Sequence, residues 1–149
     1  LMTSVLEATH KEVDWVFFGM CPTSLMPFVA EFHDFAPIDD YPKKLAGLDL
    51  DLAIAPLEFN PFNEAKSNLR LLEYGVLGYP VVCTDILPYQ NDLPVVRLKN
   101  RHRDWIKTIL DMVADRDSCR EAGAKLREAV LGGWMMEDHL AEWRDAWLP

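Results

Sequence analysis

The sequence predicts an α/β fold with a doubly wound, Rossmann-like parallel sheet that is closed by C-terminal helices. Short apolar runs alternate with helical patterns along most of the chain, which is typical of this fold class. A strand–helix–strand unit spans residues 48–85, and only helical patterns follow residue 100. Half of the 149 residues are hydrophobic, which is enough for the core of a single domain.

The unit at residues 48–85 organises the predicted sheet. The apolar run 52–57 predicts a buried strand, and the polar loop 58–66 follows it. Residues 81–83 form a second short apolar run and predict a second strand. The connection between these strands is long enough for one helix, so the two strands are expected to be parallel.

The helix of this unit has recognisable start and stop signals. Ser67 stands at the expected N-cap, ahead of Leu69, Leu72 and Val76 at helical spacing. Gly78 is expected to end the helix, because glycine readily adopts the left-handed conformation found after a helix C-terminus.

The remaining elements follow from local patterns. The run 14–20 is apolar without interruption, which is typical of a strand covered on both faces. Residues 28–35 alternate in character, which favours an edge strand. The other predicted elements are helices over 1–12, 41–47 (capped by Asp39 or Asp40), 100–115, 117–130 (ended by Gly132 and Gly133) and 134–147, and a strand over 95–98. Trp134, Trp143 and Trp147 form an aromatic set on the last helix, for which core packing or a partner surface is expected.

Charge and cysteine usage exclude several classes of function. The net charge of −9 argues against nucleic acid as a partner. No apolar run is long enough to span a membrane. The three cysteines are scattered and odd in number, which argues against a disulfide framework or a zinc site and favours a reducing, cytoplasmic compartment.

The loop and helix start at residues 64–70 form the candidate functional site. Lys66, Arg70 and the helix N-terminus together favour a phosphate site, whereas an ordinary solvated loop is the alternative. Glu73 either binds a pair of hydroxyls, such as those of a ribose, or forms an ion pair with Arg70 three residues earlier. No Walker-type loop, GxGxxG or GxSxG motif occurs.

The run KSNLRLLEYGVLGYPVV at 66–82 resembles the nucleotide-sugar-binding signature of retaining GT-B glycosyltransferases. Its form is similar to a family-four-like branch found in surface-polysaccharide and O-antigen biosynthesis, and the preceding LDLDLAIAPL resembles a strand of that family. The resemblance implies that residues 1–149 form a single, N-terminally truncated GT-B donor domain. It also implies that no metal or other cofactor is needed.

The resemblance assigns roles to particular residues. It places Lys66, Ser67, Asn68 and Arg70 at the donor diphosphate, Glu73 at the ribose, Phe35 and Ala36 beside the nucleobase, and Asn63 and Glu64 at the donor sugar. The sequence departs from the family at Ala65, where the usual E-x7-E pattern has its first glutamate. No catalytic residue is assigned in this fragment.

The resemblance implies hexosyltransferase-like transfer, with retention, from a nucleoside-diphosphate sugar to a glycan or lipid-linked acceptor. The acceptor-binding half would lie elsewhere in the same protein, so the fragment alone is expected to be inactive. The alternatives are a non-catalytic glycosyltransferase-like interaction module and a flavodoxin-like nucleotide binder, although residues 19–24 make a poor phosphate loop for the latter. The sequence also leaves open whether the protein forms a dimer through exposed apolar surface.

The resemblance also predicts that the central first strand of the sheet is absent, because the chain begins within the family's first helix. We therefore expect either direct pairing of 14–20 with 51–57 or completion of the sheet by another copy.

Overall fold

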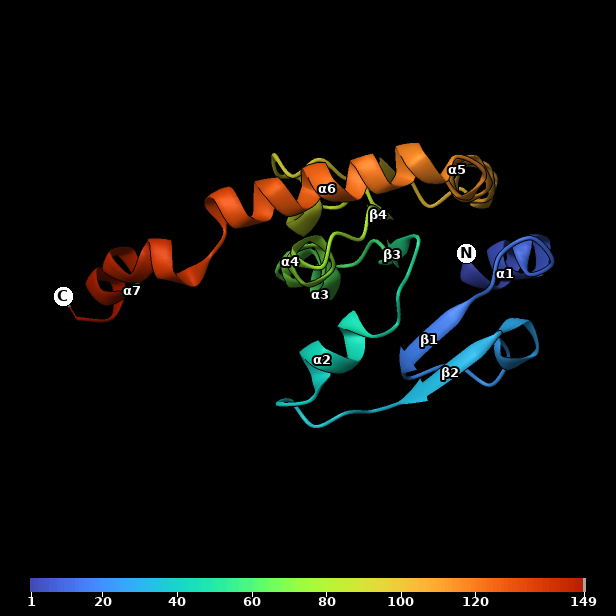
Figure 1. Ribbon diagram of the computed structural model, residues 1–149, viewed down its shortest axis with the longest axis horizontal. Helices are drawn as coiled ribbons and strands as arrows, with labels where there is room; N and C mark the ends of the chain where they lie inside the picture. Colours follow the sequence, from blue (N-terminus) through green and yellow to red (C-terminus); the bar gives the residue numbers. More distant parts are fainter. Residues whose placement is uncertain (149) are drawn as a thin grey trace.

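The computed structural model describes residues 1–148 and has parallel strands in two small sheets (Figure 1). Strand β1 (Val16–Gly19) pairs with β2 (Glu31–Asp34) in one sheet. The other sheet has the order β3-β4-β5, formed by Ala53–Ala55, Val81–Thr84 and Val96–Leu98. All three strand pairings are parallel, as the sequence predicts for an α/β fold.

Helices connect the strands and continue beyond the last strand. The α-helices are α1 (Met2–Thr9), α2 (Tyr41–Ala46), α3 (Pro61–Glu64), α4 (Leu69–Val76), α5 (His102–Ala114), α6 (Arg116–Gly133) and α7 (Leu140–Trp147). Short 3-10 helices η1, η2 and η3 span Met26–Phe28, Leu87–Tyr89 and Met136–His139. The fold therefore ends in helices, which the helical patterns after residue 100 predict.

Strand β4 separates two hydrophobic cores. Its four residues are all buried, and successive side chains point to opposite faces of the sheet. Val81 and Cys83 join the core beneath α4 and α6, whereas Val82 joins the core beneath α1 and α5. Helices thus cover both faces of the three-stranded sheet, which confirms the doubly wound arrangement for this part of the molecule.

The turn between α4 and β4 depends on glycine. Gly78 has φ of 79°, the left-handed conformation expected just after a helix end. Helix α6 packs tightly against this region, since an added Cβ at Gly123 would lie 2.0 Å from the carbonyl oxygen of Gly78. Arg127 on α6 donates from Nε to the carbonyl oxygen of Val76 at 3.1 Å, which satisfies an acceptor at the end of α4.

One expected sheet is divided into two. Direct pairing of 14–20 with 51–57 is wrong, because β1 pairs with β2 and β3 pairs with β4. The prediction that 14–20 is covered on both faces is also wrong, since all four residues of β1 are only half-buried. An apolar run predicts that its side chains are buried, but it does not predict which strand pairs with it.

Several local predictions need correction. The loop 58–66 contains the short helix α3. Helix α6 does end at the predicted glycine pair, but it includes both glycines and extends to Gly133 instead of residue 130. The last predicted helix is divided into η3 and α7. Core packing of its tryptophans is wrong, because Trp143 and Trp147 are 53% and 76% exposed. Helix α7 lies beyond the end of α6, away from both sheets (Figure 1).

Two further predictions from the sequence concern the cysteines and the absence of a membrane-spanning segment. Cys21, Cys83 and Cys119 are all free thiols. Among residues 1–148, no helix is both long enough and apolar enough to cross a membrane.

Candidate functional site

A cavity of about 380 Å³ lies where β3 ends and α4 begins. The end of β3 contributes residues 54–57, and Tyr89 of η2 closes another side. The polar lining comes from the loop before α4 and from its exposed face, namely Lys66, Ser67, Arg70 and Glu73. Ligands of parallel α/β sheets bind at this end of the strands, so the position agrees with the site predicted from sequence.

Arg70, Glu73 and Tyr41 form a polar cluster beside this cavity. Arg70 Nη1 lies 2.9 Å from Glu73 Oε2 and 2.5 Å from the Tyr41 hydroxyl. The Tyr41 hydroxyl donates to the same Glu73 oxygen at 3.1 Å. Tyr41 belongs to α2 and stacks on Phe18 of β1, with ring centroids 5.3 Å apart. The cluster therefore links the two-stranded sheet to α4.

The electrostatics of the cluster keep Arg70 charged and the tyrosines neutral. Burial alone would lower the pKa of Arg70, but the nearby oxygens of Tyr74, Glu73 and Tyr41 outweigh burial and raise it. Burial raises the pKa of Tyr74 and is also the largest cause of the raised pKa of Tyr41. A single guanidinium thus faces the cavity beside one carboxylate and two neutral phenols.

A side-chain clamp anchors the loop that leads from β3 into the site. The Leu57 amide donates to Thr84 Oγ1 at 2.8 Å, and Asn100 Nδ2 donates to the Leu57 carbonyl oxygen at 2.7 Å. Thr84 Oγ1 lies 3.1 Å from Asn100 Oδ1, which joins the ends of β4 and β5 to that of β3. Sequence reasoning missed Thr84 and Asn100, because a polar residue after a strand carries no signal of its distant partner.

The structure brings together four of the five residues predicted at the diphosphate and ribose. Lys66, Ser67, Arg70 and Glu73 line the cavity, whereas Asn68 does not. Ser67 is not the N-cap of α4. That position belongs to Asn68, and Ser67 Oγ accepts a long hydrogen bond from the Leu69 amide at 3.4 Å.

Two details of α4 also differ from the expectation. Leu69 is 56% exposed and lines the cavity instead of packing inward. Leu71 and Gly75 are the buried positions of the helix. The predicted ion pair between Arg70 and Glu73 is present.

The residues predicted near the nucleobase and the donor sugar do not line this cavity. Phe35 is 69% exposed, and its ring approaches Gly19 at the end of β1. Ala36 follows it in the chain. Asn63 is buried in α3 and donates from Nδ2 to the Glu58 carbonyl oxygen at 2.9 Å, while Glu64 is exposed. Their assigned roles stay predictions.

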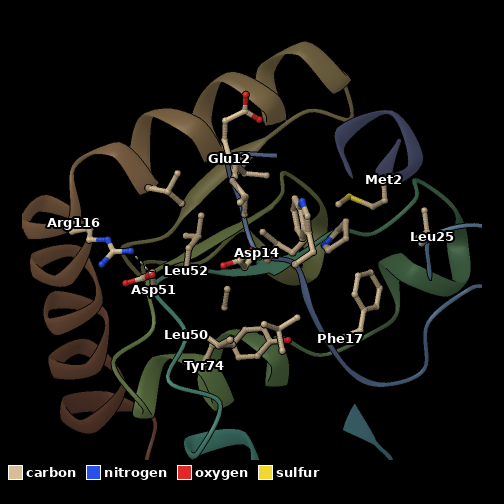
Figure 2. A pocket seen from close by; sticks show the side chains of 18 of the residues that line it. Met2, Glu12, Asp14, Phe17, Leu25, Leu50, Asp51, Leu52, Tyr74 and Arg116 are labelled. Atoms are coloured by element: carbon tan, nitrogen blue, oxygen red, sulfur yellow. Dashed lines mark ion pairs between the residues drawn. The ribbon is translucent and has the colours of Figure 1, made fainter. Parts of the chain in front are cut away.

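A larger cavity of about 580 Å³ lies next to the first, between β1 and β3 (Figure 2). The two cavities share Ile54, Pro56 and Tyr74 in their linings. The larger cavity is mainly apolar and contains none of the residues predicted to bind phosphate. Among residues 1–148, no group of three or more His, Cys, Asp or Glu side chains is placed to hold a metal ion.

Comparison with known proteins identifies the fold of this chain. No protein-family model and no curated protein sequence matches it. Two solved structures do match, and both are of TarM, a GT-B glycosyltransferase. One is a crystal structure of TarM, with a TM-score of 0.70 and 16% sequence identity over 98% of this chain. The other is a point mutant of S. aureus TarM in complex with Fondaparinux, alpha-GlcNAc-glycerol and UDP, with a TM-score of 0.70 and 17% identity over 99% of this chain.

At this level of identity the likeness concerns the fold, which is that of part of a GT-B protein. The chain spans about a third of the length of the TarM chains that it matches, 31% and 32%. What the remaining two thirds of such a protein contribute is therefore outside the matched region.

Proposed function

We propose that this chain is the donor-binding part of a retaining glycosyltransferase that uses a nucleoside-diphosphate sugar. The observation that carries the proposal is the cavity at the end of β3, which collects Lys66, Ser67, Arg70 and Glu73 in a GT-B-like fold. The family-four-like signature at 66–82 supports the same conclusion. Transfer to a glycan or lipid-linked acceptor would require a further domain, so the chain by itself is inactive in this proposal.

The proposed chemistry needs positive charge beside the leaving group. When the bond between sugar and diphosphate breaks, the diphosphate gains negative charge, which cations and backbone N–H groups stabilise. Lys66 Nζ lies 4.9 Å from the centroid of the Phe62 ring and is exposed at the cavity, while Arg70 lines the same cavity from α4. Ser67 and Asn68 lie at the start of the same helix, where its dipole favours an anion.

Glu73 would hold the ribose. Arg70 and Tyr41 both contact Oε2 of its carboxylate, so Oε1 is the atom proposed to accept a ribose hydroxyl. The side chain is 24% exposed, which is enough for contact with a ligand in the cavity. The cluster would then fix the carboxylate rotamer before the donor binds.

Calorimetric titration with UDP, GDP, ADP and CDP tests the donor site. Binding of one of these nucleotides, lost in Lys66→Ala and in Glu73→Ala, is the expected result. Lys107→Ala provides the control, because this exposed lysine lies on α5 outside the cavity. A ligand at 100 times its dissociation constant would raise the free energy of unfolding by about 2.7 kcal/mol. Equal binding to all variants would contradict the proposed site.

A non-catalytic interaction module is the second candidate, and the exposed end of the chain favours it. Leu140, Trp143 and Trp147 are 59%, 53% and 76% exposed on α7. Ala65 also replaces the first glutamate of the family pattern. Absence of nucleotide binding by a folded protein, together with loss of partner binding in Trp143→Ala, would favour this candidate.

A further inference from the structure

Two buried tyrosines in the same core differ in what their hydroxyls contact. Tyr79 and Tyr89 are 7% and 4% exposed, and both belong to the core beneath α4 and α6. The Tyr79 hydroxyl donates to the carbonyl oxygens of Leu45 and Ala46, at 3.2 Å and 3.1 Å. Within residues 1–148, by contrast, the hydrogen bonds of Tyr89 all involve its backbone. A phenol that is so buried usually has a hydrogen-bonding partner, so the unpartnered hydroxyl of Tyr89 needs an explanation.

The Tyr89 hydroxyl reaches the smaller cavity. In the part of the chain that the structure describes, every fully enclosed side-chain nitrogen or oxygen atom has a hydrogen-bonding partner. Because the Tyr89 hydroxyl has none, it must touch open space. Tyr89 lines the cavity of about 380 Å³ at the end of β3, together with Lys66, Arg70 and Glu73. The hydroxyl is therefore available to a ligand in this cavity.

Arg97 on β5 holds the segment that carries Tyr89. The Tyr89 amide donates to the Ile86 carbonyl oxygen at 2.8 Å, and its own carbonyl oxygen accepts from Arg97 Nε at 2.6 Å. Arg97 Nη2 also donates to the carbonyl oxygens of Asn91 and Leu93, at 2.8 Å and 3.0 Å. One guanidinium thus fixes the loop after η2 through its backbone. The phenol is held in place before a ligand binds, which lowers the entropy cost of binding.

The surroundings of the hydroxyl suit an anionic oxygen. Burial raises the pKa of Tyr89 to about 12, and Arg70 acts in the opposite direction. The phenol is therefore neutral at physiological pH and can donate a proton to a hydrogen bond. Lys66 and Arg70 outnumber Glu73 among the charged residues of the lining. Hydrogen bonds to charged acceptors are about twice as strong as those between neutral groups, so a phosphate oxygen gains most from this donor.

We propose that the Tyr89 hydroxyl donates a hydrogen bond to a phosphate oxygen of the ligand in the smaller cavity, on the side opposite the start of α4. This inference rests on the proposed donor site and names a further binding residue for it. Lys66 and Arg70 would hold the diphosphate from the loop before α4 and from α4 itself. Tyr89 would hold it from η2, which follows β4.

Tyr89→Phe tests the proposal, because it removes the hydroxyl and keeps the ring. Calorimetry compares this variant with the unchanged protein in titrations with UDP, GDP, ADP and CDP, with inorganic pyrophosphate, and with the nucleoside of the nucleotide that binds. The affinities for the nucleoside diphosphate and for pyrophosphate should fall about tenfold or more, since the lost hydrogen bond has a charged acceptor. The affinity for the nucleoside should stay the same, because it carries no phosphate.

Tyr79→Phe is the matched control from the same core. This variant should lower the midpoint of urea denaturation, because it removes the hydroxyl that bonds Leu45 and Ala46. It should leave nucleotide affinity unchanged, since Tyr79 does not line the cavity. Tyr89→Phe should show the opposite pattern, with a midpoint that is equal or higher, because its hydroxyl bonds no protein group. The two variants therefore separate a role in binding from a role in folding.

The outcomes distinguish this inference from the donor site on which it rests. Unaltered affinity of a folded Tyr89→Phe protein, while Lys66→Ala abolishes nucleotide binding, would overturn the role of Tyr89 and leave the donor site standing. An equal loss of affinity for the nucleoside would also overturn it, because the hydroxyl would then contact the nucleoside. A fall in the urea midpoint as large as that of Tyr79→Phe would reveal a structural partner instead. Absence of nucleotide and pyrophosphate binding by the unchanged protein would contradict the donor site and this inference together.

Discussion

Strands β1 and β4, one from each sheet, are both formed from short apolar runs, yet they differ sharply in burial. All four residues of β4 are buried, whereas all four residues of β1 are half-buried. Strand β4 has a strand on each side and helices over both faces, whereas β1 has one neighbour. The difference shows that strand burial depends on neighbours supplied by distant segments, and that stability should concentrate in the three-stranded sheet.

The variant with the largest expected effect on stability disrupts the packing of α6 against the turn that leads into β4. Gly123→Ala places a methyl group 2.0 Å from the Gly78 carbonyl oxygen, and backbone cannot move aside easily. We expect the free energy of unfolding to fall by about 3 kcal/mol, because overpacking forces the helix away from the turn. Chemical denaturation measures this change. Gly132→Ala on the same helix is the control, since no atom lies within 4 Å of the added methyl, and it should be neutral or stabilising.

A matched pair of truncations compares the two sheets directly. Val82→Ala removes methyl groups from a fully buried position of β4 and should cost about 2 kcal/mol of unfolding free energy. Phe32→Ala removes a larger side chain from β2, but this side chain is 44% exposed, so its cost should stay under about 1 kcal/mol. Urea denaturation of both variants gives the comparison. A larger loss for Phe32→Ala would show that β1 and β2 contribute more stability than their burial indicates.

A third variant removes the clamp at the ends of the three-stranded sheet. Thr84→Val keeps the shape of the buried side chain but leaves the Leu57 amide without its acceptor at 2.8 Å. The free energy of unfolding should fall by about 1.5 kcal/mol, the range found when a buried donor loses its partner. Hydrogen exchange at Leu57 should quicken while exchange in β1 and β2 stays the same. A uniform change across both sheets would contradict this local role.

The smallest expected effect is a loss of stability at alkaline pH, which is caused by the buried thiol of Cys83. Burial raises the pKa of the Cys83 thiol in β4 to about 12, from a usual value of 9.0. The folded protein therefore keeps this thiol neutral while the unfolded chain ionises it, so stability is complete below pH 9 and falls as pH rises toward 12. The loss at about pH 10 should be roughly 1 kcal/mol.

Cys83→Ala tests this pH dependence. Thermal unfolding at about pH 8 and about pH 10 should show a smaller difference for the variant than for the unchanged protein. Cys21, which is only half-buried beside the end of β1, supplies the comparison with the other sheet. Its thiol should react with a disulfide reagent in the folded protein, while Cys83 reacts only after unfolding. Rapid reaction of Cys83 in the native state would contradict its burial.

The candidate site was predictable where it depends on one short segment. Lys66, Ser67, Arg70 and Glu73 lie within eight residues, the first two in the loop directly before α4 and the other two one turn apart on the helix, so local geometry keeps them close together. Tyr41 was not predictable as the partner of Glu73, because 32 residues separate them and the contact needs α2 to pack beside α4. Phe35 and Ala36 were assigned by resemblance alone, and they do not line the cavity.

By itself, the sequence determined most of the helices and strands, the parallel direction of β3 and β4, and the turn at Gly78. These features depend on side-chain period, on the length of a connection and on one residue's conformational freedom, all of which are local properties. Tertiary structure alone decided that the strands divide into two sheets and that Thr84 and Asn100 hold Leu57. Those outcomes need backbone and side-chain groups far apart in the chain to find hydrogen-bonding partners, which no local pattern specifies.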